Sequence, residues 1–136
     1  MPTEIEALCD TIEDCYEFTL SYAARGLTTD EDSDAGRQLR EKLAAALKAI
    51  RGLEAAFRAV ATQMQTGQGD KLEAFAGVLN RDAQSSCAVV DLVLAQPAIS
   101  SQLIDNLNAS IHLRALLTDL FLITEIVAGQ QARAAS

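Results

Sequence analysis

The sequence is poor in aromatic residues and proline, and both shortages indicate how it folds. Four Phe, two Tyr and no Trp leave most of the apolar volume to alanine and leucine, which suits closely packed helices. The two prolines, Pro2 and Pro97, leave long stretches that a helix can occupy without interruption. No apolar run reaches the ~18 residues that a membrane span requires. The acidic start MPTEIE also differs from the basic start of a signal peptide. The sequence therefore predicts a cytoplasmic protein without a membrane segment.

Paired cysteines and basic residues are also scarce. Cys9, Cys15 and Cys87 are odd in number and lack the CxxC spacing of metal and redox sites, so we expect small apolar side chains in a reducing compartment. The net charge of −8 argues against nucleic-acid binding, because contact with phosphates depends on basic side chains. The charge is uneven, since residues 1–34 carry −9 and residues 35–66 carry +4.

Apolar residues recur with a seven-residue period between Leu39 and Met64. Alternating steps of four and three residues are typical of one buried face of a long α-helix. The members of this seam are Leu39, Leu43, Ala46, Ile50, Leu53, Phe57, Val60 and Met64. Because such a seam needs partner helices to cover it, the sequence predicts a helical bundle.

Capping signals and turns divide the chain into four expected helices. Thr3 with Glu6, and Asp70 with Glu73, have the spacing of a capping box, and Pro97 suits the first turn of the last helix. The expected helices span about residues 3–25, 34–66, 70–96 and 100–128. Three short connections favour antiparallel neighbours. The predicted fold is one all-α domain over residues 1–136, an up-down-up-down antiparallel four-helix bundle.

The last two expected helices carry more apolar side chains than one buried face can hold. At ~100° per residue, Leu122 points about 180° away from Leu113, so one face cannot bury both. A helix that is apolar all round either lies inside a larger core or is covered by another chain. We therefore predict a homodimer with an interface that also contacts an unidentified protein partner. The predicted interface residues are Leu92, Leu116, Phe121, Leu122 and Ile126.

The first expected helix has an acidic face opposite its apolar stripe, formed by Asp10, Glu13, Asp14 and Glu17. This face is either solvated or a docking ridge for a basic partner. The basic residues outside the seam of residues 34–66 are either solvated in turn or paired with these acids, in the same subunit or in a neighbouring one.

Groups for catalysis, cofactor binding or metal binding are few. A di-iron carboxylate site needs two Glu-x-x-His pairs, whereas this chain has the single histidine His112. The acidic segment that starts at Asp30 matches the EF-hand pattern at too few positions for a calcium loop. No GxxxxGK or GxGxxG motif is present. We therefore expect no enzymatic activity, no cofactor and no metal.

One short segment, His112-Leu113-Arg114-Ala115, resembles the phosphorylated segment of histidine phosphotransfer domains, which are also helical bundles. In that family one further residue separates the histidine from the leucine, so the register differs here. The resemblance implies that His112 would accept the phosphoryl group and that Arg114 would be its electrostatic neighbour.

Two polar residues, Asn106 and Ser110, lie on the apolar seam of residues 103–113. If they face the bundle centre, they either bond across the core and set the helix register or line a small-molecule pocket. The leading prediction is a non-enzymatic, homo-oligomeric bundle that acts as a protein-binding adaptor, chaperone-like or regulatory module. The alternatives are a small-molecule sensory or carrier bundle with a pocket near Asn106 and Ser110, and a phosphotransfer module that uses His112.

Overall fold

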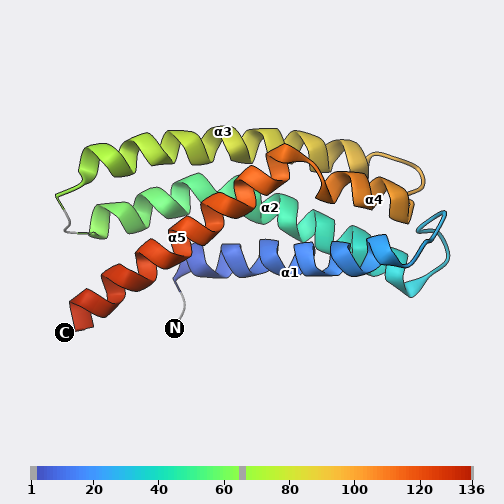
Figure 1. Cartoon of the computed structure of the whole chain (residues 1–136), viewed down its shortest axis with the longest axis horizontal. Coiled ribbons are helices and arrows are strands. Elements are labelled where there is room, and N and C mark those ends of the chain that lie inside the picture. The colour runs from blue at the N-terminus through green and yellow to red at the C-terminus, as the bar shows by residue number, and fades with distance from the viewer. Residues whose placement is uncertain (1–2, 65–66, 136) are drawn as a thin grey trace.

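The structure, a computed structural model, describes residues 3–64 and 67–135, with side chains up to Arg133. Within these residues it contains helices and no strand, which confirms the all-α prediction. The helices are α1 (Glu4–Ala24), α2 (Asp34–Gln63), α3 (Gly69–Leu94), α4 (Ser101–Asn108) and α5 (Ile111–Ala135) (Figure 1). The helix α2 packs between α1 and α3, α4 packs against α1, and α5 packs chiefly against α3.

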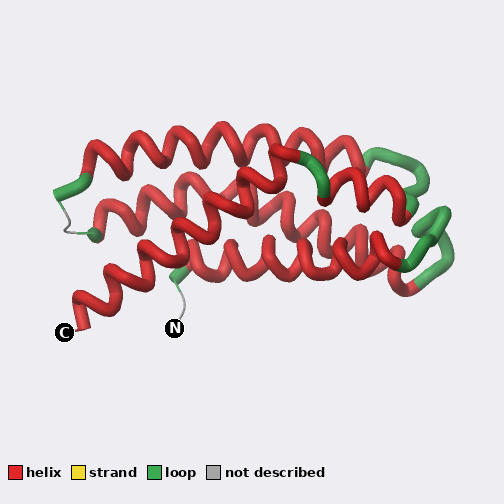
Figure 2. The backbone as a smooth tube through the Cα atoms, viewed as in Figure 1, coloured by secondary structure: helices red, strands yellow, loops and turns green. Residues whose placement is uncertain are grey.

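The expected single helix at residues 100–128 is wrong, because two helices occupy this stretch. The N–H of Ala109 donates to the carbonyl of Asp105 and the N–H of Ser110 donates to the carbonyl of Leu107, which closes α4. The carbonyl of Ser110 then accepts from the N–H of Arg114 in the first turn of α5. Figure 2 shows the resulting bend between the two helices. Neither residue of the break is glycine or proline, so no local breaker predicted it.

The break allows α5 to leave the line of α4 and cross the bundle obliquely (Figure 1). Its far end returns to the start of α1, where Gln131 Nε2 donates to Glu6 Oε1 over 3.1 Å. Because α5 lies across the outside of the other helices, only one of its faces can point into the core.

One of the two predicted capping boxes is confirmed in its main contact. Thr3 Oγ1 accepts from the N–H of Glu6 over 3.3 Å at the start of α1. The box at Asp70 and Glu73 is wrong, because α3 begins at Gly69 and the carboxylate of Glu73 accepts instead from the guanidinium of Arg58 on α2. Glu73, which the local sequence pattern assigned to a helix cap, therefore makes a tertiary contact instead.

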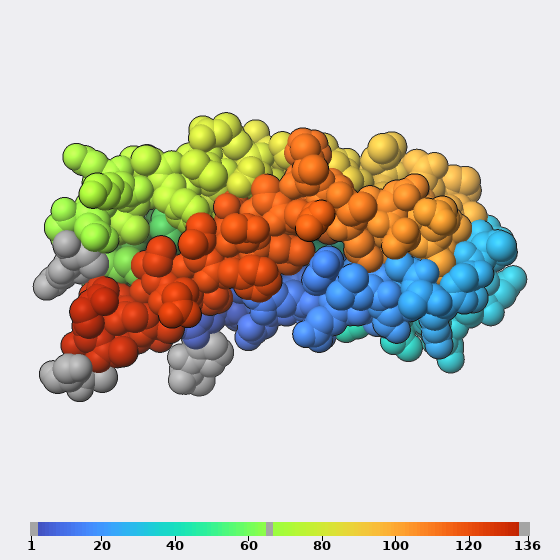
Figure 3. Space-filling view, in the orientation of Figure 1, coloured from blue at the N-terminus to red at the C-terminus, as the bar shows by residue number. Residues whose placement is uncertain are grey.

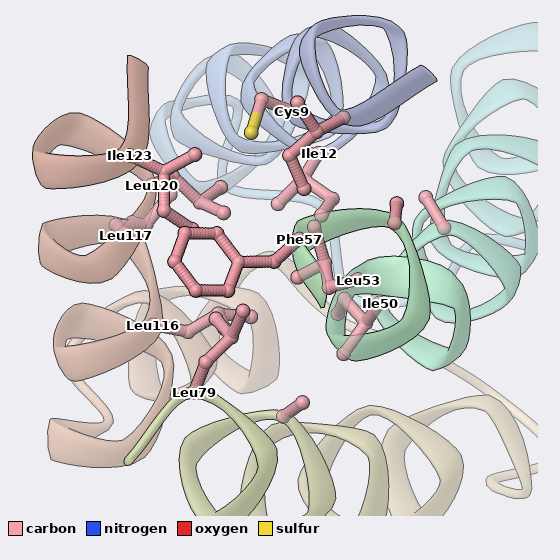
Figure 4. Packing of buried hydrophobic residues seen from close by; sticks show 14 of the residues in the cluster. Cys9, Ile12, Ile50, Leu53, Phe57, Leu79, Leu116, Leu117, Leu120 and Ile123 are labelled. Atoms are coloured by element: carbon pink, nitrogen blue, oxygen red, sulfur yellow. The ribbon is translucent and has the colours of Figure 1, made fainter. Parts of the chain in front are cut away.

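Two groups of apolar side chains fill the bundle along its length. In the first, the ring of Phe57 lies among Leu116, Leu117 and Leu120 of α5 and Leu79 of α3 (Figure 4). The second lies along the other half of α2, where Leu39 and Leu43 of α2 are grouped with Tyr22 of α1, Val90 of α3 and Ile104 of α4. The predicted seam of α2 is thus buried from Leu39 to Phe57.

An ion pair between the half-buried Arg40 of α2 and the buried Asp30 lies at one end of the bundle. The guanidinium of Arg40 donates to the buried carboxylate of Asp30 and to the carbonyls of Leu94 and Gln96. Asp30 Oδ1 also accepts from the N–H of Ile99 over 2.6 Å. The hydrogen bond from Arg40, strengthened by the one from Ile99, holds the pKa of Asp30 below its ordinary value. These contacts hold the connection between α3 and α4 against α2 and the loop that precedes it.

Candidate partner-binding surface on α5

The helix α5 exposes large apolar side chains on its outer side. Phe121 is 59 %, Leu122 48 % and Ile126 44 % exposed, and the outer surface of α5 is uncovered in the space-filling view (Figure 3). Leu92 of α3 is exposed as well. Leu116 is 0 % exposed and packs in the chain's own core, so its assignment to a partner interface is wrong.

The reason for this exposure lies in the oblique position of α5. Its inward face already buries an unbroken apolar row, which consists of Leu113, Leu116, Leu117, Leu120, Ile123 and Val127. Burying one further leucine or phenylalanine side chain would stabilise the protein by ~1.5–3 kcal/mol. Contact of the exposed side chains with another surface would gain this free energy.

The segment that contains α5 is close to electrically neutral, and its exposed charges form no ion pair among the described residues. Residues 111–133 contain two basic and two acidic residues, whereas the chain as a whole carries −8. Arg114 and Glu125 are exposed, and neither side chain takes part in an ion pair within the described residues.

The predicted acidic face of α1 lies at the surface but is not wholly free of cations. Lys42 of α2 donates to Asp14 over 2.6 Å, which is one instance of the predicted pairing between the first two helices. Burial raises the pKa of Glu13, and the negative charges of Asp10 and Glu17 raise it further. The negative charges of these three acids therefore repel one another. That this face docks a basic partner stays a prediction.

The two residues predicted to line a pocket, Asn106 and Ser110, lie at the surface of α4 and just past the end of that helix. Asn106 is exposed and accepts from Gln102 one turn earlier over 3.2 Å, so it does not face the bundle centre. Ser110 belongs to the break between α4 and α5. The buried polar side chain is that of Asn108, whose amide oxygen and nitrogen have no hydrogen-bond partner within the described residues. Asn106 and Asn108 both lie on α4, and it is Asn108 that faces the core.

A pair of carboxyl groups lies between α3 and α5, and the sequence reasoning missed it. Asp119 is only 6 % exposed, and its Oδ2 has no hydrogen-bond partner within the described residues. The pKa of Asp119 is raised to about 7, chiefly by burial and also by the hydrogen bond and the charge of Asp82 on α3. Near neutral pH the pair can therefore share one proton. The only sequence signal was an acid inside an apolar run.

The groups considered for chemistry are separated in the structure. His112 is exposed at the start of α5, and its backbone carbonyl accepts from Ser86 Oγ over 3.1 Å. Burial raises the pKa values of Cys9 and Cys15 to about 12, so both remain protonated thiols at neutral pH. Across residues 3–64 and 67–135, no three His, Cys, Asp or Glu side chains are grouped to hold a metal ion. The same residues contain no helix with the length and hydropathy of a membrane span.

Comparison of the chain with family models, curated proteins and solved structures finds no match, so its function has to be argued from its own residues.

Proposed function

We propose that this protein is a non-enzymatic, homo-oligomeric helical bundle, a dimer in its simplest form, that acts as a protein-binding adaptor. In this proposal α4 and α5 together take the fourth position of an antiparallel bundle. The observation that carries it is the exposure of Phe121, Leu122 and Ile126 on one helix whose other face is already buried. Exposed apolar patches on a folded protein mark sites where other proteins bind.

The charge of α5 favours a second copy as the first partner. Two chains that each carry −8 repel one another over most of their surfaces. The balanced segment 111–133 is where two copies meet with the least repulsion. The acidic face of α1 would then stay free for a different, basic protein.

The proposal is tested by measuring mass in solution. Light scattering on the purified protein at micromolar concentration should give two subunits per particle, and Phe121→Ser should shift the equilibrium toward the monomer. The matched control is Leu20→Ser, which removes an exposed leucine from α1. A wild-type protein that is monomeric throughout this range would overturn the proposal.

The exposure of His112 supports a second candidate, phosphotransfer through its imidazole, because a phosphoacceptor must be reachable by a kinase. Incubation with a histidine kinase and labelled ATP should then label the wild type but not His112→Ala. Equal labelling of the two proteins, or of neither, would remove this candidate. The small-molecule alternative loses its main support because Asn106 is exposed.

A further inference from the structure

The solvent side of α5 carries a second seam with a seven-residue period. Its residues are all exposed and follow one another in steps of three, four, three, four and three: Ile111, Arg114, Thr118, Phe121, Glu125 and Ala128. This is the spacing at which helices pack along one line in a coiled coil. The seam is distinct from the buried row that begins at Leu113, so one helix presents a line of contact on each of two sides.

Residues at equal distances from the middle of the outer seam are complementary in charge or size. Around a point midway between residues 119 and 120, Arg114 and Glu125 occupy equivalent positions with opposite charge. Phe121, which is 59 % exposed, is equivalent to the smaller Thr118. Likewise Ile111, which is 74 % exposed, is equivalent to Ala128. Each large side chain is thus matched with a small one, and the basic side chain with the acidic one.

We propose that α5 packs antiparallel against α5 of a second copy, about a two-fold axis that passes between residues 119 and 120. This inference rests on the proposed dimer and specifies its interface. Two-fold symmetry places each residue of one copy opposite its equivalent in the other, so two Arg114–Glu125 ion pairs form across the axis. Phe121 of each copy then meets Thr118 of the other, where a small side chain allows the helices to approach closely.

A parallel arrangement fits the same residues poorly. It would place Arg114 opposite Arg114, Glu125 opposite Glu125 and Phe121 opposite Phe121, which joins like charges and leaves no small residue to receive the ring. The lack of any ion pair for Arg114 or Glu125 within the described part of the chain leaves both free to form one between copies.

Charge reversal and mixing test this geometry. Arg114→Glu alone places two acids opposite each other at both contacts, and Glu125→Arg alone places two bases there. Sedimentation should show that each variant alone has a dimer dissociation constant roughly tenfold or more above the wild type. A mixture of the two variants should form heterodimers close to wild-type affinity, because the antiparallel geometry then restores both ion pairs. The double variant R114E/E125R should also dimerise.

The matched controls reverse exposed charges on α2, Lys48→Glu and Glu41→Arg, which change the net charge equally and should leave dimerisation within about twofold. A wild-type dimer that both single variants leave intact overturns the antiparallel α5 pairing and leaves the proposed function standing. Weakened single variants that do not recover on mixing also overturn the pairing. A monomeric wild type overturns both. Circular dichroism confirms that each variant keeps its helices.

Discussion

The carboxyl pair between α3 and α5 predicts that the protein loses stability as the pH rises through neutrality. The pKa of Asp119 rises from 3.8 to about 7, so the folded state holds this proton more tightly than the unfolded chain does. The stabilisation is therefore complete below about pH 3.8 and is lost as the pH rises through about 7. At 1.36 kcal/mol per pKa unit, the whole effect is at most about 4 kcal/mol.

The variant Asp119→Asn isolates this contribution. Its amide cannot ionise, keeps the size of the carboxyl group and can donate to the carboxylate of Asp82. Between pH 5 and pH 8 the free energy of unfolding of the wild type should fall by about 2–3 kcal/mol relative to the variant, so that the variant is the more stable protein at pH 8. Urea denaturation followed by circular dichroism at a series of pH values measures both curves.

The difference between the two curves matters because other carboxyl groups titrate in both proteins. Asp105→Asn, at an exposed site on α4, is the matched control and should follow the wild type at each pH. Parallel curves for wild type and Asp119→Asn would show that the carboxyl group is hydrated in solution, and the reasoning from burial would be refuted.

Five further substitutions test the packing. Gly36→Ala would place a methyl group 1.8 Å from a backbone carbonyl oxygen and should lower the melting temperature sharply. Gly77→Ala on α3 meets no atom closer than 3.6 Å and should raise the free energy of unfolding by ~0.5–1 kcal/mol. Arg40→Ala leaves a buried carboxylate unpaired and should cost about 3 kcal/mol in urea denaturation, a loss that shrinks in acid as the carboxylate is protonated. Leu116→Ala should cost about 2–5 kcal/mol of unfolding free energy. Leu122→Ala should change the free energy of unfolding of the monomer very little. Equal losses for the two variants would contradict the different burial of Leu116 and Leu122.

Much of the secondary structure follows from residues near one another in the sequence. The bounds of α1 and α2 lie within a few residues of those expected, because a cap and a helical period act over one or a few turns. The same period correctly separates Leu113, which is buried, from Leu122, which is exposed. A helix turns by the same angle whatever it packs against, so opposite faces are already opposite in the sequence.

The tertiary structure alone decided where α5 lies and what it covers. The break at Ala109 and Ser110 has no glycine or proline to announce it, yet it sets the oblique path of α5. That path buries Leu116 within the chain, and it brings Asp119 against Asp82, 37 positions earlier in the sequence. The local sequence determines which residues share a face of a helix. What that face meets depends on how distant helices compete to cover one another, and this is settled only when all of them pack together.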